Sequence, residues 1–157
     1  MTFEPRVHSV LVEFVLRKFD ELVRLASQLD DEAANRTTAH VDSNSVIQIL
    51  VHCCGMMRRW SASVNLGIEV PRDREAEFTA QMPVAEALEL AARTRAEFLV
   101  DVEQTDPAAT PVAVPPGRED FWTVSCEGVL LHVFEELCQH LGQAEVTRDV
   151  VVQSQAR

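Results

Sequence analysis

Four stretches of the chain repeat apolar residues at intervals of three or four positions, which is the spacing of an amphipathic helix. The pattern predicts helices over residues 5–29, 45–66, 83–103 and 125–149. Residues 150–152, three valines in a row, are the one part of the chain that resembles a strand. We therefore expect residues 1–157 to form a single all-α domain, most simply a four-helix bundle.

Local signals mark the ends of these helices. Pro5 suits a first helical position, where its missing N–H costs nothing. Ser45 followed three residues later by Gln48 has the spacing of a capping box. Gly67 is the residue type that commonly ends a helix in a left-handed conformation. The second helix is therefore the one with the clearest bounds.

The connections between the helices differ in composition. Residues 30–44 are polar and residues 71–75 form a charged loop. Residues 106–120 contain four prolines and Gly117, so we expect no regular structure there. A loop of this length in a compact domain is often functional, and we expect it to close over a site. Phe121 and Trp122, at its end, are expected to anchor it to the bundle.

Composition narrows the range of functions. The 157 residues carry 25 acidic and 14 basic side chains, a net charge of −11. This balance argues against nucleic acid and against an anionic membrane surface as partners. The sequence has neither a signal-peptide pattern nor an apolar run long enough to span a membrane. The four cysteines form no C-x-x-C pair, so we expect free thiols in a reducing cytoplasm.

The last predicted helix carries the most informative polar pattern. His132, Glu136 and His140 follow one another at intervals of four residues. On a helical wheel Glu136 lies about 40° and His140 about 80° from His132, so all three share one face. Glu135 falls on the solvent side, so Glu136 is the carboxylate of interest. His52 borders the apolar stripe of the second helix in the same way, and the two edges together would offer three N/O ligands and an open position for a divalent metal.

Ordinary structural roles are the alternative for each of these residues. A histidine at the edge of a core is usually only that, and a Glu–His pair four residues apart is common on helices. His132 has three open interpretations: a metal ligand, a hydrogen-bonding partner of Glu136, or a surface residue. Gln143, on the same face, is a candidate partner of a ligand. His8 and His40 lack such surroundings and are taken as ordinary.

The cysteines are weaker candidates for the chemistry. Cys53 faces the core on the wheel, and Cys54 lies about 200° from His52. Cys138, two residues after Glu136, points away from it. We therefore do not expect a cysteine to share the metal or to act as a nucleophile beside a histidine.

The sequence resembles the DinB-like metal-binding bundles, and among them the metal-binding domain of mycothiol-dependent maleylpyruvate isomerase. The resemblance lies in His52 within Ile49-Leu50-Val51-His52, and in the pattern H-x-x-x-E-x-x-x-H-x-G-[HQ]-x-[DE] that begins at His132. It extends from the first helix to Arg148. It implies a four-helix bundle that holds a divalent metal, often zinc, through His52, Glu136 and His140. It also implies that the metal holds a low-molecular-weight thiol such as mycothiol as the nucleophilic thiolate.

Two departures from that family matter. The isomerase has an additional C-terminal domain that this shorter chain lacks, so maleylpyruvate is not the expected substrate. Gln143 occupies the position of a frequent second histidine, so we do not expect a ligand there. Dimerisation is an expectation from the family alone.

Three functions remain open. The first is a metal-dependent thiol transferase or isomerase, with a small-molecule substrate whose carboxylate pairs with an arginine. The candidate arginines are Arg58, Arg59, Arg72 and Arg74, for which solvated positions are the alternative. The second is metal-dependent hydrolysis, with His132 as a base. The third is a non-catalytic, stress-related bundle in which Met56, Met57 and Trp60 form core or a dimer interface. Zinc is the first choice of metal and nickel the second, since histidine and glutamate suit several divalent ions.

Overall fold

The computed structural model describes residues 9–40 and 42–156 of the chain. Its long helices are α1 (Val10–Ser27), α3 (Val46–Arg58), α5 (Val84–Gln104) and α6 (Cys126–Gln155), and the π-helix η1 (Arg59–Asn65) continues α3. The connections contain α2 (Asp31–Asn35), α4 (Arg74–Glu77) and the 3-10 turn η2 (Phe121–Val124). These described residues include no strand. The expected all-α, four-helix class is confirmed.

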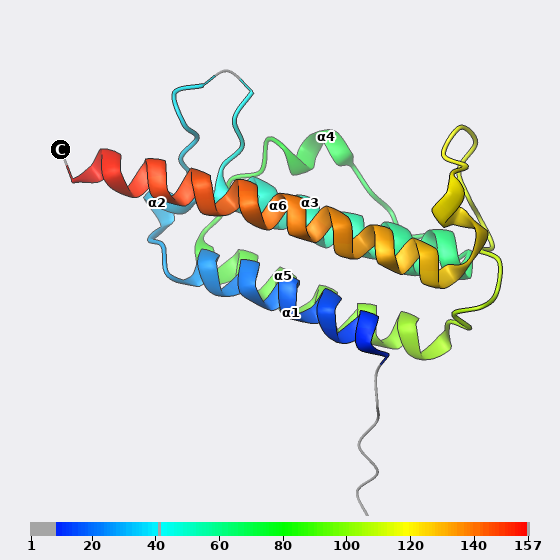
Figure 1. The fold of residues 1–157 in the computed structure, drawn as a ribbon. Helices are drawn as coiled ribbons and strands as arrows, with labels where there is room; N and C mark the ends of the chain where they lie inside the picture. The colour runs from blue at the N-terminus through cyan, green and yellow to red at the C-terminus, as the bar shows by residue number, and fades with distance from the viewer. Residues whose placement is uncertain (1–8, 41, 157) are drawn as a thin grey trace, which may run out of the picture.

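The four long helices surround one hydrophobic core (Figure 1). α1 packs on α6 and α5, and α3 packs on the same two helices, so the four close into a ring. Large apolar side chains from all four fill the centre, among them Phe19, Leu50, Met57, Phe98 and Leu137. Burial of such side chains is worth about 1.5–3 kcal/mol each, which makes this shared core the main source of stability.

Both ends of the second long helix lie where the sequence predicted them. Ser45 Oγ accepts the amide of Gln48 at 3.1 Å, and Gln48 Oε1 accepts the amide of Ser45 at 3.0 Å, as a capping box requires. Gly67 has a φ of +69°, where a Cβ would also lie 2.7 Å from Val112 Cγ1. Ser9 caps α1 by accepting the amide of Val12 at 3.3 Å. The start expected at Pro5 lies outside the described residues.

Two connections and the C-terminal tail differ from expectation. Residues 30–44 contain α2, which Asp30 caps. The loop expected at 71–75 runs into the short helix α4, which Asp73 caps. Residues 150–152 are helical, because α6 continues to Gln155 and buries Val151 against the bundle. The predicted strand-like tail was therefore wrong.

The proline-rich segment 106–120 is irregular, as predicted, and its first half is tied to two helix ends by backbone hydrogen bonds. Val112 and Ala113 donate their amides to the carbonyls of Asn65 and Val64 at the end of η1. The amides of Cys126 and Glu127, at the start of α6, donate to the carbonyls of Ala109 and Pro107. The segment thereby satisfies polar groups that helix ends leave without intrahelical partners.

None of the helices in the described parts of the chain is both long enough and apolar enough to cross a membrane.

Candidate metal centre

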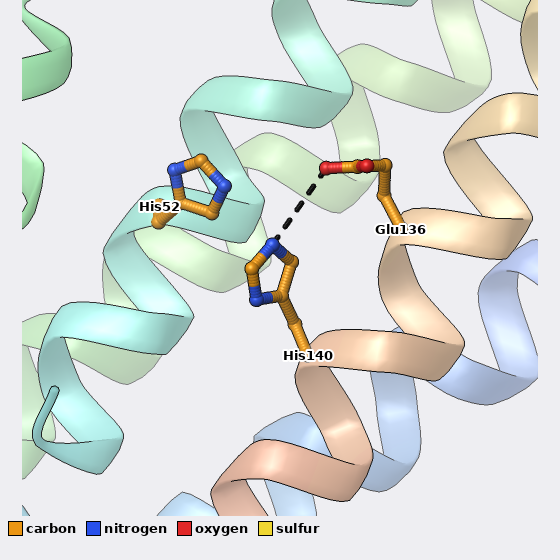
Figure 2. Close-up of side chains that lie close together, drawn as sticks. All are labelled: His52, Glu136 and His140. Atoms are coloured by element: carbon orange, nitrogen blue, oxygen red, sulfur yellow. Dashed lines mark ion pairs between the residues drawn. The ribbon is translucent and has the colours of Figure 1, made fainter. Parts of the chain in front are cut away.

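Three side chains from two helices converge at the edge of the core. His52 extends from α3, and Glu136 and His140 extend from α6 (Figure 2). One ligand atom of each lies within 4.8 Å of those of the other two. Among the described residues, no other group of three or more His, Cys, Asp or Glu side chains is close enough to share an ion. The rings of His52 and His140 meet edge to face with centroids 4.7 Å apart.

Glu136 and His140 lie on adjacent turns of α6. Glu136 Oε2 lies 3.7 Å from His140 Nε2, the contact marked in Figure 2. The neighbouring His140 imidazole lowers the pKa of Glu136 against the opposing effect of burial. The neighbouring Glu136 carboxylate in turn raises the pKa of His140. Glu136 is therefore an ionised ligand candidate, while a proton on His140 competes with a cation for that nitrogen.

His140 has a second partner on its own helix. Its Nδ1 donates to Gln143 Oε1 at 3.2 Å. A histidine that uses one ring nitrogen as a donor presents the other as an acceptor, so this bond leaves Nε2 for a metal. The structure thus places Gln143 where it can set the tautomer of His140.

His52 is held by residues from outside its helix. Its Nδ1 donates to Glu77 Oε2 at 2.8 Å, and both groups are buried. Arg72 donates hydrogen bonds from Nε to Glu77 Oε1 at 2.6 Å and from Nη2 to Glu77 Oε2 at 2.9 Å. Burial would raise the pKa of Glu77, but hydrogen bonds from His52 and Arg72 hold it below its usual range. Glu77 therefore remains a carboxylate that fixes His52 with Nε2 free.

A glycine makes room for this arrangement. Gly55 lies one turn after His52, and a Cβ there would be 2.1 Å from Glu77 Oε1 and 3.1 Å from Arg72 Nε. Phe78 stacks on the His52 ring with centroids 4.6 Å apart. Helix α4 and its flanking residues thus cover His52 from outside the bundle.

Glu77 was not among the residues predicted from the sequence. Residues 71–75 were expected to be only a loop, and Arg72 a candidate for binding a substrate. The available signals were weak: Asp73 at a capping position, and Gly55 on the same helix face as His52. Neither reveals that Glu77 contacts a histidine 25 positions earlier.

His132 lies beside the trio. Its ring stacks on Trp122 with centroids 4.0 Å apart and meets Trp60 edge to face at 5.2 Å. Its Nε2 lies 4.0 Å from Glu136 Oε1, and its Nδ1 lies 3.4 Å from Glu135 Oε2. This places His132 in aromatic packing next to Glu136, outside the group that can share an ion.

The two aromatic residues that follow the proline-rich segment have different roles. Trp122 packs on Trp60 and His132, so it anchors the segment as expected. Phe121 is 82% exposed, so the same expectation for it was wrong. A Cβ on Gly128 would lie 2.1 Å from the carbonyl oxygen of Trp122, which explains why that position on α6 has no side chain.

A cavity of about 250 Å³ opens beside His52 and Glu136. Four arginines line it: Arg59, Arg72, Arg74 and Arg118. Arg58 is not among them, because it pairs with Asp101 and, at 3.1 Å, with Glu97, both on α5. Of the two adjacent arginines proposed from the sequence, the structure therefore brings only Arg59 to the site.

The cysteines lie apart from the candidate ligands. Burial raises the pKa of Cys53 well above its usual range, and raises that of Cys54 to about 12. Cys138 is exposed on α6. None of the three has the low pKa expected of a nucleophilic thiol.

The fold and this site define an all-α bundle of the DinB-like class, with a possible His–Glu–His metal site between its second and last long helices. The chain belongs to the mycothiol S-transferase family, whose model matches residues 10–153. The DinB-like resemblance is therefore confirmed. The matching family is named for S-transfer, whereas the sequence pattern had pointed to the isomerase branch.

The other comparisons bear on the fold alone. No protein with a curated description matches the chain. The crystal structure of the conserved protein of a locus from Enterococcus faecalis is similar, with a TM-score of 0.70 and 15% identity. The similarity covers 94% of this chain and 98% of that one. It supports the arrangement of the helices.

Proposed function

We propose that this protein binds one divalent metal ion, preferably zinc, through His52, Glu136 and His140, and transfers a low-molecular-weight thiol of the mycothiol type to a small electrophile. The convergence of the three side chains carries the proposal. Membership of the mycothiol S-transferase family supports the class of reaction. A reducing cytoplasm, where such a thiol stays reduced, is the proposed setting.

The donor set fits a divalent ion. Nδ1 of His52 donates to Glu77, and Nδ1 of His140 donates to Gln143, so each ring offers Nε2. Glu136 is held ionised by its histidine neighbours. Two imidazoles and one carboxylate are typical of catalytic zinc sites, which leave a further position open. The same donors also accept nickel, so we name zinc first on chemistry and leave nickel as the second candidate.

A divalent ion held there would supply one thing: it would favour the thiolate form of a thiol that coordinates it. The thiol sulfur would form a bond to the electrophilic carbon of the substrate. In a displacement, the leaving group would depart with the electron pair of the broken bond, and the thiol proton would go to solvent. In an addition to a polarised double bond, the neighbouring carbon would take up a proton in place of the one that the thiol gave up. The cysteines of the chain are buried or have raised pKa values, so the thiol is proposed to come from outside.

The residues of the chain hold and orient these components. Glu77 and Gln143 fix the two histidine rings. The cavity beside His52 and Glu136 provides space for the substrate. His132 and Trp122 form the aromatic wall next to Glu136.

Metal content and thiol dependence together test this proposal. The proteins are the parent, His52→Ala, His140→Ala and a control, His40→Ala, which alters an exposed histidine. We expect about one equivalent of metal in the parent and the control, and none in the other two. Consumption of an electrophile such as chlorodinitrobenzene should require both the metal and the added thiol.

Two results would overturn the proposal. If the parent binds neither zinc nor nickel added in excess, the metal site and the transferase mechanism both fail. If the parent binds metal but acts equally well without any thiol, the activity belongs to metal-dependent hydrolysis.

A further inference from the structure

The cavity beside the candidate metal centre differs in charge from the rest of the molecule. The chain has a net charge of −11. The cavity nevertheless gathers four guanidinium groups, Arg59, Arg72, Arg74 and Arg118, around about 250 Å³. The two other charged or titratable lining groups are His52 and Glu136, which we propose as metal ligands.

The four arginines are not equivalent. Arg72 forms two hydrogen bonds with Glu77, so its charge is compensated within the protein. Arg59, Arg74 and Arg118 make no ion pair with any acidic group in the described parts of the chain. Arg58 shows the contrast, because it faces α5 and pairs with both Glu97 and Asp101.

Aromatic rings position two of the uncompensated arginines. The Cζ of Arg74 lies 5.1 Å from the centroid of Phe78, and Phe78 in turn stacks on His52. The Cζ of Arg118 lies 5.5 Å from the centroid of Trp60. A guanidinium over a ring is attracted to its π-face and keeps its N–H groups free at the edge. Arg59, in η1, is half-buried and is the third arginine of the group.

We propose that Arg59, Arg74 and Arg118 form an oxyanion subsite, so that the electrophile taken by the proposed thiol transferase carries a carboxylate or phosphate group. The inference rests on the proposed function for the identity of the electrophile, whereas the anion site itself is independent of it. Guanidinium groups bind such oxyanions with paired, charge-assisted hydrogen bonds. The subsite adjoins the trio, so an anchored anion places the rest of a small molecule beside the thiol.

A local cluster of positive charge also matters in an acidic protein. The overall field repels an anionic substrate, while a cavity lined by charge of one sign concentrates its counter-ion. The subsite therefore favours small anions that reach the cavity over neutral electrophiles of the same shape. Its effect should weaken as salt is added, because partly exposed charges are screened.

Binding of unreactive anions tests the subsite without any turnover. Succinate and inorganic phosphate are titrated separately by calorimetry into the metal-loaded parent, into Arg59→Gln/Arg118→Gln, and into Arg17→Gln/Arg24→Gln. The last variant loses the same charge from a groove on α1 that shares no residue with the site cavity. Arg118→Gln alone changes an exposed residue and is measured in addition, in case the double variant does not fold.

We expect one or both anions to bind the parent and the α1 variant alike. Affinity should fall at least about tenfold in Arg59→Gln/Arg118→Gln, as expected for lost hydrogen bonds to a charged group, and less in Arg118→Gln. Tighter binding of succinate identifies a carboxylate substrate, and tighter binding of phosphate identifies a phosphorylated one.

Two outcomes overturn the subsite. One is equal affinity in the parent and Arg59→Gln/Arg118→Gln, which would mean that the anion binds the metal alone. The other is absence of binding to the parent. If thiol transfer to a neutral electrophile proceeds all the same, only the subsite fails; if anions bind but no thiol is required, only the proposed function fails.

Discussion

The two helices that carry the candidate ligands support them in different ways. On α6, Glu136, His140 and Gln143 lie on one helix face, and the ion pair and the hydrogen bond among them span four and three residues. On α3, His52 depends on Glu77, which follows it by 25 residues and belongs to another helix. The residues on α6 are thus close together because of the helical repeat, whereas His52 and Glu77 are brought together only by the tertiary fold.

Among substitutions that leave the three candidate ligands in place, we expect the largest effect from removing the partner of His52. Glu77→Ala leaves His52 Nδ1 and the Arg72 guanidinium without their buried acceptor. Metal affinity should fall roughly 10–100-fold, the usual range for losing an outer partner of a ligand. The measurement is a competition titration against a chelator of known affinity.

The matched control for this change lies on the same short helix. Glu75 is exposed, so Glu75→Ala removes the same charge without touching His52. Equal affinities in the two variants would show that Glu77 does not orient the ligand.

Crowding the contact between His52 and Glu77 should lower metal affinity less than removing Glu77 does. In Gly55→Ala the new Cβ would approach Glu77 Oε1 to 2.1 Å, so the carboxylate must shift away from His52. We expect a loss of metal affinity of about tenfold, at the lower end of that range. Gly142→Ala, on α6, is the control, because its added Cβ would meet nothing within 4 Å beyond its chain neighbours and the backbone of its own helix.

The control should behave differently in stability as well. Alanine is favoured over glycine inside a helix by about 1 kcal/mol, so Gly142→Ala should raise the melting temperature and leave metal affinity unchanged. A Gly55→Ala protein that binds metal as tightly as the Gly142→Ala protein would contradict the steric argument.

On α6, we expect that removing the partner of a ligand lowers metal affinity less than it does for His52. Gln143→Ala removes the acceptor of His140 Nδ1, but the side chain of His140 is 17% exposed, against 5% for His52. Water can therefore replace the lost oxygen, and affinity should fall by only about threefold. A loss in Gln143→Ala as large as that in Glu77→Ala would remove the proposed difference between the two helices.

The smallest expected effect on the site comes from the cysteines. Cys138 on α6 is exposed, whereas Cys53, Cys54 and Cys126 are buried. Iodoacetamide should therefore modify Cys138 alone in the native protein, without loss of metal. Partial burial raises the pKa of Cys138, so labelling should accelerate as pH rises above neutral. Mass spectrometry of native and unfolded samples counts the modified thiols, and labelling of Cys53 in the native state would contradict the burial described above.

Features that depend on residues close in sequence could be predicted from the sequence, and features that depend on the tertiary fold could not. The long helices were predicted because each buries a periodic apolar face, and the Ser45–Gln48 cap was visible because its partners are close in sequence. The short helices α2 and α4 have no apolar period and depend on their caps and on packing. The π-helical turn of η1 was not foreseen either, because helix registers of this kind depend on the surrounding structure.

The candidate site shows the same limit. The spacing of Glu136 and His140 on one helix was sufficient to suggest their proximity. A helical wheel would also have separated the two arginines where α3 passes into η1, because Arg59 follows His52 by two turns and Arg58 does not share that face. Glu77 could not be found in this way, since only the folded chain brings it to His52.

The proline-rich segment has a consequence for how molecules enter the site. Pro115 and Arg118 line the cavity, and the half of the segment before them is fastened by backbone hydrogen bonds to both η1 and α6. Swinging that half outward would break those bonds and expose the ends of two helices to solvent. The wall formed by Pro115 and Arg118 thus lies between this fastened half and Trp122, which packs on Trp60 and His132. We therefore expect the wall to stay in place as ligands enter, unlike the closing loop expected from the sequence, so that entry rates are set by diffusion and charge.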